Sequence, residues 1–232
     1  MKAILLAAGF GTRLRPLTDT VPKCLVAVNG KPLLGIWLDK LFRADIDRVL
    51  INTHYLSSKV EDFVSQSEYK SKVDLFHEPV LLGTAGTLLA CDKFVGNGPV
   101  LLAHADNLSN FNVLDFINAH NNRPPQCNMT MMLFNTDDPK SCGIVELNEL
   151  GVVVNFHEKS LCPPSNLANA AVYILEADLV KEYQSLEPRI TDISTEIIPS
   201  NLGKIFTYLN SQYHRDIGNL ESLRLANIEY IA

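Results

Sequence analysis

The sequence predicts an α/β protein with a mixed, mainly parallel sheet and helices on both faces. In the first half, short apolar runs alternate with amphipathic stretches. An uninterrupted apolar run is typical of a strand buried on both faces, and strands that alternate with helices are typical of a parallel sheet. Beyond Gln126, strands follow one another with only turns between them. The second half is therefore expected to add antiparallel strands that form one wall of a ligand site.

Hydrophobic spacing predicts the elements of the first half. Residues 3–8 form an uninterrupted apolar run, which predicts the first strand. Leu34, Leu38 and Leu41 recur at helical spacing, and Pro32 stands at a permitted first-turn position, so 31–44 is expected to be a helix. The same reasoning predicts strands at 48–52, 73–77 and 99–103 and helices at 56–67, 84–91 and 110–120.

The second half is read in the same way. Its strands are expected at 129–134, 143–147, 152–156, 170–175 and 204–209, and its helices at 176–183, 191–199 and 219–231. The Pro-Pro pairs at 124–125 and 163–164 are expected to be loops inside one fold. With no repeat and no linker in the sequence, residues 1–232 are expected to form a single domain.

Composition limits the class of function. The 232 residues, 47% hydrophobic and 20% charged, are typical of a globular chain that builds its own core. The five cysteines are odd in number, widely spread and without a CxxC pair, which predicts reduced thiols rather than disulfides or a zinc site. No apolar run reaches the length of a membrane span, and no signal peptide is recognised. A cytoplasmic protein without a membrane partner, either monomer or homodimer, is expected.

The charge balance makes one region of the sequence informative. A net charge of −6 argues against a nucleic-acid partner, and an anionic small ligand would need a local basic cluster. The first strand leads into a Gly-x-Gly loop, Ala8 to Thr12, followed by Arg13, Arg15 and Lys23. Glycines let backbone N–H groups approach phosphate oxygens, and a guanidinium binds phosphate in bidentate fashion. A plain strand-to-loop turn with surface arginines is the alternative interpretation.

Spacing argues against two other nucleotide loops. A P-loop needs Gly-x-x-x-x-Gly-Lys-Ser/Thr, which is absent. A dinucleotide fingerprint needs a third glycine, where Leu14 stands, and an acidic residue at the end of the second strand. That strand instead ends in Asn52-Thr53-His54, with no carboxylate to hold a ribose. An NAD site is therefore disfavoured.

Residues 8–16 and Pro22-Lys23 resemble the opening signature of the sugar-1-phosphate nucleotidylyltransferases. The resemblance continues in order along almost the whole chain, through Glu78-x-x-x-Leu82-Gly83-Thr84-Ala85-Gly86, Asp106, Gly143-Ile144-Val145, Phe156-x-Glu158-Lys159 and Asp216-Ile217-Gly218. It implies the Rossmann-like nucleotide-diphospho-sugar transferase fold, with sugar-binding insertions in the second half and no C-terminal β-helix domain. The sequence departs from the family pattern at Ala8, Cys24, Ala171 and Asn219, where a glycine, a proline, a glycine and a threonine are usual.

The resemblance also implies the site residues. Nucleotide contacts are expected from Ala8, Gly9, Gly11, Thr12, Arg13, Glu78, Gly83 and Thr84, and sugar-phosphate contacts from Gly143, Glu158, Lys159 and Asn169. Arg13, Lys23 and Asp106 are the expected catalytic residues. Asp106 and Asp216 are the expected ligands of Mg²⁺, which prefers one or two carboxylates together with phosphates and waters. A turn or cap role is the alternative for any single loop aspartate.

The implied reaction is attack by a sugar-1-phosphate oxygen on the α-phosphorus of a nucleoside triphosphate, which releases pyrophosphate. The attacking phosphate is already ionised, so catalysis would depend on alignment and charge neutralisation rather than on a general base. Arg13 and Mg²⁺ are expected at the leaving group and Lys23 at the α-phosphate. Glu158 and Lys159 are expected to point in different directions, Glu158 to sugar hydroxyls and Lys159 to the sugar phosphate.

The base and the sugar remain open at this point. The segment 82–86 looks most like that of mannose-1-phosphate or manno-heptose-1-phosphate guanylyltransferases, with uridylyl- and thymidylyltransferases as alternatives. A glycosyltransferase would typically carry Asp-x-Asp, whereas Leu108 stands two residues after Asp106. A non-catalytic nucleotide-sugar sensor is disfavoured because Arg13, Lys23 and Asp106 are all present. The six histidines show no paired zinc spacing, and Trp37 is expected to be a core residue.

Overall fold

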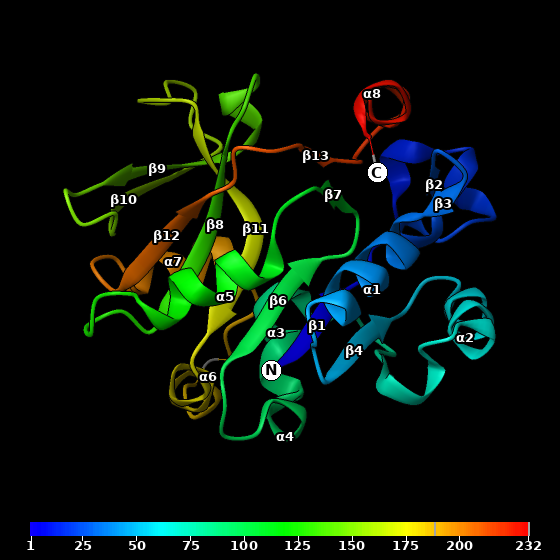
Figure 1. Ribbon diagram of the computed structural model, residues 1–232, viewed down its shortest axis with the longest axis horizontal. Coiled ribbons are helices and arrows are strands. Elements are labelled where there is room, and N and C mark those ends of the chain that lie inside the picture. The colour runs from blue at the N-terminus through cyan, green and yellow to red at the C-terminus, as the bar shows by residue number, and fades with distance from the viewer. Residues whose placement is uncertain (188, 232) are drawn as a thin grey trace. The chain divides into compact units, whose positions relative to one another are not determined.

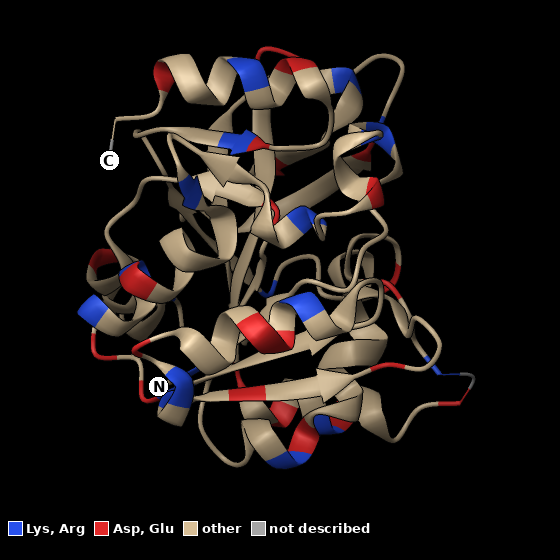
Figure 2. Ribbon diagram, turned by 90° about the vertical axis from the view of Figure 1, so that its right-hand side faces the viewer, with Lys and Arg blue, Asp and Glu red and all other residues tan. Residues whose placement is uncertain are grey.

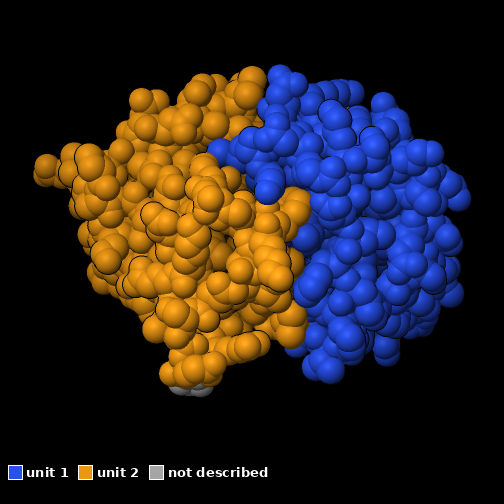
Figure 3. All heavy atoms as spheres, turned by 90° about the horizontal axis from the view of Figure 1, so that it is seen from below, with its two compact units in different colours: residues 1–81, 102–111, 212–232 blue, residues 82–101, 112–211 orange. Residues whose placement is uncertain are grey.

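A mixed sheet with helices organises the chain in the computed structural model, which confirms the α/β fold class (Figure 1). The structure describes residues 1–187 and 189–231. These divide into two units, coloured separately in Figure 3. Unit 1 comprises residues 1–81, 102–111 and 212–232, and unit 2 comprises residues 82–101 and 112–211.

Unit 1 contains the parallel strands that the first half predicts. Strand β1 (Lys2–Leu6) pairs in parallel with β4 (Arg48–Thr53), which pairs in parallel with β5 (Val73–His77). The last residues of β6 (Val100–His104) also belong to this unit, beside β1. The helices of unit 1 are α1 (Leu33–Arg43), α2 (Ser57–Gln66) and α8 (Leu220–Glu229). Two short antiparallel pairs complete it: β2 (Ala27–Val28) with β3 (Lys31–Pro32), and β7 (Asn107–Ser109) with β13 (His214–Asp216).

Unit 2 contains the antiparallel strands expected in the second half. Its strands are β8 (Met129–Asn135), β9 (Gly143–Leu147), β10 (Val153–Glu158), β11 (Leu167–Leu175) and β12 (Ile205–Leu209). β10 pairs with β9, and β11 pairs with both β9 and β8, all antiparallel, whereas β12 runs parallel to β8. The helices are α3 (Gly83–Ala90), α4 (Asp92–Val95), α5 (Val113–Asn121), α6 (Ala177–Gln184) and α7 (Ile198–Ser200).

The structure corrects three details of the sequence-based expectation. Pro32 does not lie in the first turn of a helix, because its extended backbone (φ −57°, ψ 140°) belongs to β3 and α1 begins at Leu33. The helix expected at 191–199 is a π-helical segment, Ile193–Ile197, followed by the short α7. β7 and β13 were not expected, because strands of three residues are too short to show a hydrophobic period.

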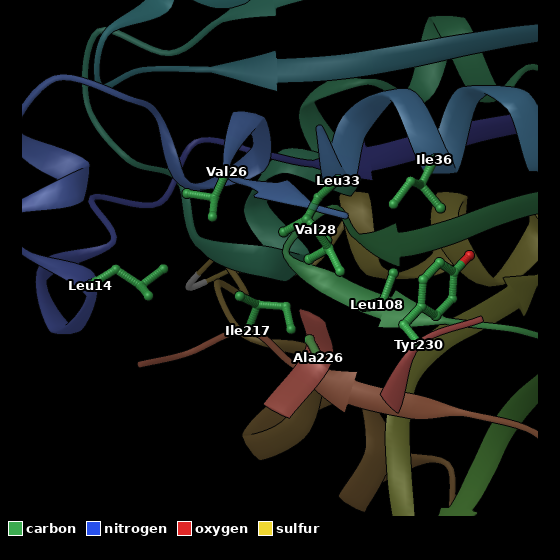
Figure 4. Close-up of a cluster of buried hydrophobic side chains, with 9 residues drawn as sticks. All are labelled: Leu14, Val26, Val28, Leu33, Ile36, Leu108, Ile217, Ala226 and Tyr230. Carbon is green, nitrogen blue, oxygen red and sulfur yellow. The ribbon is translucent and has the colours of Figure 1, made fainter. Parts of the chain in front are cut away.

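A buried apolar cluster in unit 1 includes the residues that directly follow two of the predicted charged residues (Figure 4). Leu14 follows Arg13, and Ile217 follows Asp216. The cluster comprises Leu14, Val26, Val28, Leu33, Ile36, Leu108, Ile217, Ala226 and Tyr230. Fully burying a side chain of this size contributes about 1.5–3 kcal/mol, so these anchors fix loops that have little regular structure of their own.

Trp37 is a core residue, as expected. It is buried on α1, and its Nε1 donates a hydrogen bond of 2.8 Å to the carbonyl oxygen of Asn107 in β7. A buried indole N–H needs such an acceptor, so Trp37 fixes α1 against β7. Basic and acidic residues are interspersed along the helices (Figure 2). No helix in the described part of the chain is long and apolar enough to cross a membrane.

Ala171, one of the departures from the family pattern, has a strained backbone conformation. Ala171 has a φ of +53°, in the left-handed region, and the pairing of β11 with β8 shifts register between Asn169 and Tyr173. This region disfavours residues that carry a Cβ and suits glycine. The position therefore retains the conformation of a glycine while carrying an alanine.

We predict that Ala171→Gly raises the free energy of unfolding by roughly 0.5–1 kcal/mol, because relief of the left-handed strain exceeds the added entropy of the unfolded chain. Thermal unfolding followed by circular dichroism measures the change. Ala170→Gly is the matched control, since this neighbouring buried alanine has no positive φ and its replacement should lower the stability. A loss of stability in Ala171→Gly would contradict the strain.

Candidate functional site

The glycine loop of unit 1 closes tightly on the segment that carries Lys23. Gly11 has a φ of +65°, and its carbonyl oxygen accepts a 2.8 Å hydrogen bond from Thr18 Oγ1. A Cβ on Gly11 would lie 3.0 Å from Thr18 Cγ2 and 3.1 Å from Lys23 Cβ. A Cβ on Gly9, by contrast, would meet no atom within 4 Å. The loop is thus packed at Gly11 and open at Gly9.

The short 3-10 turn Thr12–Leu14 contains one core residue and one exposed charged residue. Leu14 is fully buried, whereas the side chain of Arg13 is 70% exposed. Ala8, the first residue of the loop, is buried. The turn therefore uses Leu14 as its anchor and presents the Arg13 guanidinium to solvent, where an anion can reach it.

A buried hydrogen-bond network supports the start of this loop. Ala7 N–H donates to Asn52 Oδ1 at 2.6 Å, and Asn52 Nδ2 donates to Glu78 Oε1 at 2.8 Å. Glu78 is 1% exposed, and its backbone N–H donates to the Thr53 carbonyl oxygen. His54 Nδ1 lies 2.7 Å from the Glu78 carbonyl oxygen, which can only accept, so this nitrogen carries the proton. The structure thus links Glu78, through Asn52, to the backbone at the start of the loop. No motif in the sequence indicated this role of Asn52.

Lys23 joins the two aspartates that the sequence predicts as metal ligands. Its Nζ hydrogen-bonds to Asp106 Oδ2 and lies 3.3 Å from Asp216 Oδ1. Arg13 Nη2 lies 3.8 Å from Asp216 Oδ2. A Cβ on Gly218 would lie 2.6 Å from Asp216 Oδ2 and 3.1 Å from Arg13 Nη2, so this glycine makes room for the pair. The structure brings all four charged residues of unit 1 into one cluster.

The pairing of β7 with β13 brings the two aspartates together. Asp216, the last residue of β13, is opposite Asn107, and the Ile217 N–H donates to the Asp106 carbonyl oxygen at 3.2 Å. Asp106 itself lies between β6 and β7. These segments are far apart in the sequence, and the strand pairing shows how their carboxylates come together.

The contacts in the cluster keep Lys23 and Asp106 charged. Burial opposes the charge of Lys23, but Asp106 and Asp216 outweigh it and raise the pKa of the ammonium above its ordinary value. Burial likewise opposes ionisation of Asp106, but Lys23 and then His104 hold the pKa of this carboxyl below its ordinary value. Burial, followed by the charge of Asp106, raises the pKa of the Cys24 thiol to about 12, so this thiol stays protonated.

Two converging carboxylates fit a divalent cation. In the structure both aspartates approach a single ammonium, so one positive centre is within reach of both. Carboxylate oxygens are the donors that Mg²⁺ prefers, with phosphates and waters completing its shell. Within residues 1–187 and 189–231, no group of three or more His, Cys, Asp or Glu side chains is arranged to hold a metal.

In unit 2, Glu158 is the last residue of the strand β10, and Lys159 follows it in a turn. Glu158 is opposite Gly143 of β9, where a Cβ would lie 2.8 Å from Glu158 Oε2 and 2.3 Å from Phe156 Cζ. Gly143 thus makes room for both side chains. Lys159 has a φ of +48°, and its Nζ lies 3.6 Å from Glu158 Oε1. The expectation that the two side chains point apart is wrong, because this turn folds the ammonium back toward the carboxylate.

Asn169 is held by its neighbours on β11. Its Nδ2 donates to Tyr173 Oη at 2.7 Å, and its Oδ1 accepts from Ala171 N–H at 2.9 Å. Burial raises the pKa of Tyr173, so its hydroxyl stays neutral and able to accept. The i, i+4 spacing of Asn169 and Tyr173 would place them on one face of a regular strand, and the bulge at Ala171 accommodates their contact.

Gly83 and Thr84 form the start of α3. Gly83 has a φ of +79°, and a Cβ there would lie 2.3 Å from the Thr191 carbonyl oxygen. Thr84 Oγ1 donates to Asp192 Oδ2 at 3.2 Å and accepts from Ile193 N–H at 2.9 Å. Both predicted residues are thus packed against the segment that precedes the π-helical turn.

Comparisons with known proteins agree with the motifs. The family model described as nucleotidyl transferase matches residues 2–232. The chain is 30% identical over 224 residues to a mannose-1-phosphate guanylyltransferase of Mycobacterium tuberculosis and 32% identical over 226 residues to a probable mannose-1-phosphate guanylyltransferase 3 of Oryza sativa. Each alignment covers 94% of this chain and 61% of the relative, so the chain spans about three-fifths of the length of these proteins.

Solved structures show the same fold. A putative glucose-1-phosphate thymidylyltransferase from Bacillus anthracis superposes with a TM-score of 0.87 at 25% identity, covering 98% of this chain and 94% of that one. HddC from Yersinia pseudotuberculosis, solved with GMP-PN, superposes with a TM-score of 0.82 at 22% identity, covering 98% of both chains, which supports the fold alone. The family expected from the motifs is confirmed, and the chain belongs to the nucleotidyl transferase family.

Proposed function

We propose that the chain transfers a nucleotidyl group from a nucleoside triphosphate to a sugar-1-phosphate, with Mg²⁺, to give a nucleotide sugar and pyrophosphate. The observation that carries this proposal is the cluster of Lys23 and Arg13 with two converging aspartates beside an open glycine loop. The names of the relatives at 30–32% identity support the same reaction class.

Asp106 and Asp216 are proposed to hold the metal. When bound, Mg²⁺ supplies positive charge that offsets the charge of the phosphates. Lys23, which the two aspartates hold charged in this structure, would then bind the α-phosphate in place of these carboxylates. Arg13, exposed at the turn, binds the oxygens of the departing pyrophosphate. No general base is needed, because the attacking phosphate oxygen is already ionised.

The residues of unit 2 proposed to bind the sugar-1-phosphate are Gly143, Glu158, Lys159 and Asn169. Gly83 and Thr84, in the segment 82–86 of the same unit, are proposed to contact the nucleotide. Lys159, whose side chain is 67% exposed, can leave Glu158 at little energetic cost and bind the phosphate. Glu158 is then released to accept hydrogen bonds from sugar hydroxyls. Asn169, held in place by Tyr173, is a further hydroxyl partner. Gly143 contributes by leaving space for Glu158.

GTP with mannose-1-phosphate or a manno-heptose-1-phosphate is our proposed substrate pair. The guanylyltransferase names of the curated relatives favour GTP. The thymidylyltransferase with the same fold keeps dTTP, and with it UTP, as the second candidate. All five cysteines are free thiols, which fits the cytoplasmic location that we propose. We further propose that the enzyme acts as a monomer or homodimer.

The direct test is pyrophosphate release. Turnover of GTP is expected only when Mg²⁺ is present together with a sugar-1-phosphate, either mannose-1-phosphate or a manno-heptose-1-phosphate. The reason is that the proposed site has no nucleophile of its own. Asp106→Asn is expected to lose nearly all turnover while retaining the wild-type circular dichroism spectrum. Equal turnover with water as acceptor would contradict the reaction class, and a preference for UTP or dTTP would contradict only the guanylyl assignment.

Removing the ammonium should expose the metal site. We predict that Lys23→Met lowers the melting temperature, since two carboxylates then lose their shared cation, and that millimolar Mg²⁺ restores much of the loss. Differential scanning calorimetry with and without Mg²⁺ measures both effects. Lys31→Met is the control, because this lysine pairs with Asp39 on the surface. Destabilisation that Mg²⁺ leaves unchanged would argue against a metal at the two aspartates.

The two units should respond separately to loss of a cation. Arg13→Ala is expected to raise the KM for the triphosphate, and Lys159→Ala the KM for the sugar-1-phosphate, each by about ten- to a hundredfold for a lost charged hydrogen bond. Steady-state kinetics with each substrate varied in turn measures the split. If either variant raises both constants equally, the assignment of Arg13 and Lys159 to different substrates is wrong.

A further inference from the structure

The carboxylate of Glu196 organises a turn in unit 2 that the proposed mechanism does not use. One oxygen, Oε2, accepts the backbone N–H groups of Thr191 and Asp192, both at 2.8 Å, and the Thr191 hydroxyl at 3.2 Å. Three donors on one carboxylate oxygen make a strong, charge-assisted set of bonds. These backbone bonds also hold the pKa of Glu196 below its ordinary value, so the carboxylate is charged at neutral pH.

The Thr191–Asp192 turn packs against the segment 82–86 and hydrogen-bonds to it. The Thr191 carbonyl oxygen accepts the N–H groups of Ala85 at 3.0 Å and Gly86 at 3.4 Å. The side chain of Asp192 accepts from Thr84 Oγ1, which in turn accepts from Ile193 N–H. The Thr191 oxygen also leaves no space for a side chain at Gly83. A change in the turn must therefore move the start of α3.

The same turn reaches the proposed sugar side less directly. The Ser194 side chain hydrogen-bonds to Tyr173, whose hydroxyl accepts from Asn169. The π-helical segment Ile193–Ile197 brings Ser194 to this position, and Asp192 caps it by accepting from Thr195 N–H at 2.9 Å. Single π-helical turns are rare and occur mostly at functional sites. The turn therefore contacts Asn169 only through the side chains of Ser194 and Tyr173, whereas it bonds directly to the segment 84–86.

We propose that Glu196 is a positioning residue for nucleotide selection, which holds the segment 82–86 in the geometry that distinguishes one base from another. The inference rests on the proposed function, in which this segment contacts the nucleotide. Glu196 acts only through the Thr191–Asp192 turn. Its loss should therefore alter the use of the triphosphate more than that of the sugar-1-phosphate.

The test compares Glu196→Ala and Glu196→Gln with the wild-type enzyme. Glu196→Ala is expected to raise the KM for the preferred triphosphate about tenfold and to reduce its kcat/KM advantage over the other triphosphates by a similar factor. The KM for the sugar-1-phosphate should change less than threefold. Glu196→Gln keeps an acceptor oxygen but loses the charge, so its KM and its discrimination among triphosphates should lie between those of the wild-type enzyme and Glu196→Ala. Glu182→Ala, an exposed acidic residue of α6, is the matched control and should behave as wild type.

Two kinetic outcomes would overturn the proposal. One is unchanged discrimination among triphosphates in a folded Glu196→Ala or Glu196→Gln protein. The other is an equal rise of both KM values, which would indicate general loosening. If the wild-type protein turns over no triphosphate, the proposed function fails, and amide hydrogen exchange tests the positioning separately. Exchange at 84–86 should then be about tenfold faster in Glu196→Ala than in wild type, and an unchanged rate would contradict the contact.

Discussion

The shared contact of Lys23 with Asp106 and Asp216 is the interaction on which the candidate site depends. It ties the segment after the glycine loop to the end of β6 and to β13, three parts of the chain that are distant in sequence. A buried charge that loses its partner destabilises a protein by about 3–5 kcal/mol. The apolar cluster around Leu14 and Ile217 sets the backbone positions, and the ion pairs then set the side chains (Figure 4).

This arrangement would reconcile an acidic chain with the anionic substrates that we propose. The net charge of −6 repels phosphates at long range, so binding must come from local groups. In our proposal Lys23 and Arg13 provide them. Both aspartates contact Lys23, and Asp216 also lies 3.8 Å from Arg13. A divalent cation at the aspartates would compete with Lys23 for the same oxygens. Metal binding and release of Lys23 to a phosphate are therefore coupled in our proposal.

The sequence predicted more of the fold than of the site's internal contacts. Apolar runs such as 3–8 and 129–134 correspond to β1 and β8, because hydrophobic period reports burial directly. The motifs identified the charged residues of both units. The three-residue strands β7 and β13 carry no period, so the convergence of Asp106 and Asp216 could be expected only by resemblance. Asn52 and Glu196 act through backbone N–H groups, whose positions depend on tertiary structure.

The central claim is that the contact between Lys23 and Asp106 stabilises the folded protein. A double-mutant cycle measures the energy of this contact. The free energies of unfolding of wild type, Lys23→Met, Asp106→Asn and the double variant give the coupling energy between the two side chains. We predict a favourable coupling of at least about 1.5 kcal/mol in the absence of metal and nucleotide, as for a largely buried charge pair. A coupling below about 0.5 kcal/mol would contradict the claim, since independent sites show only that residual.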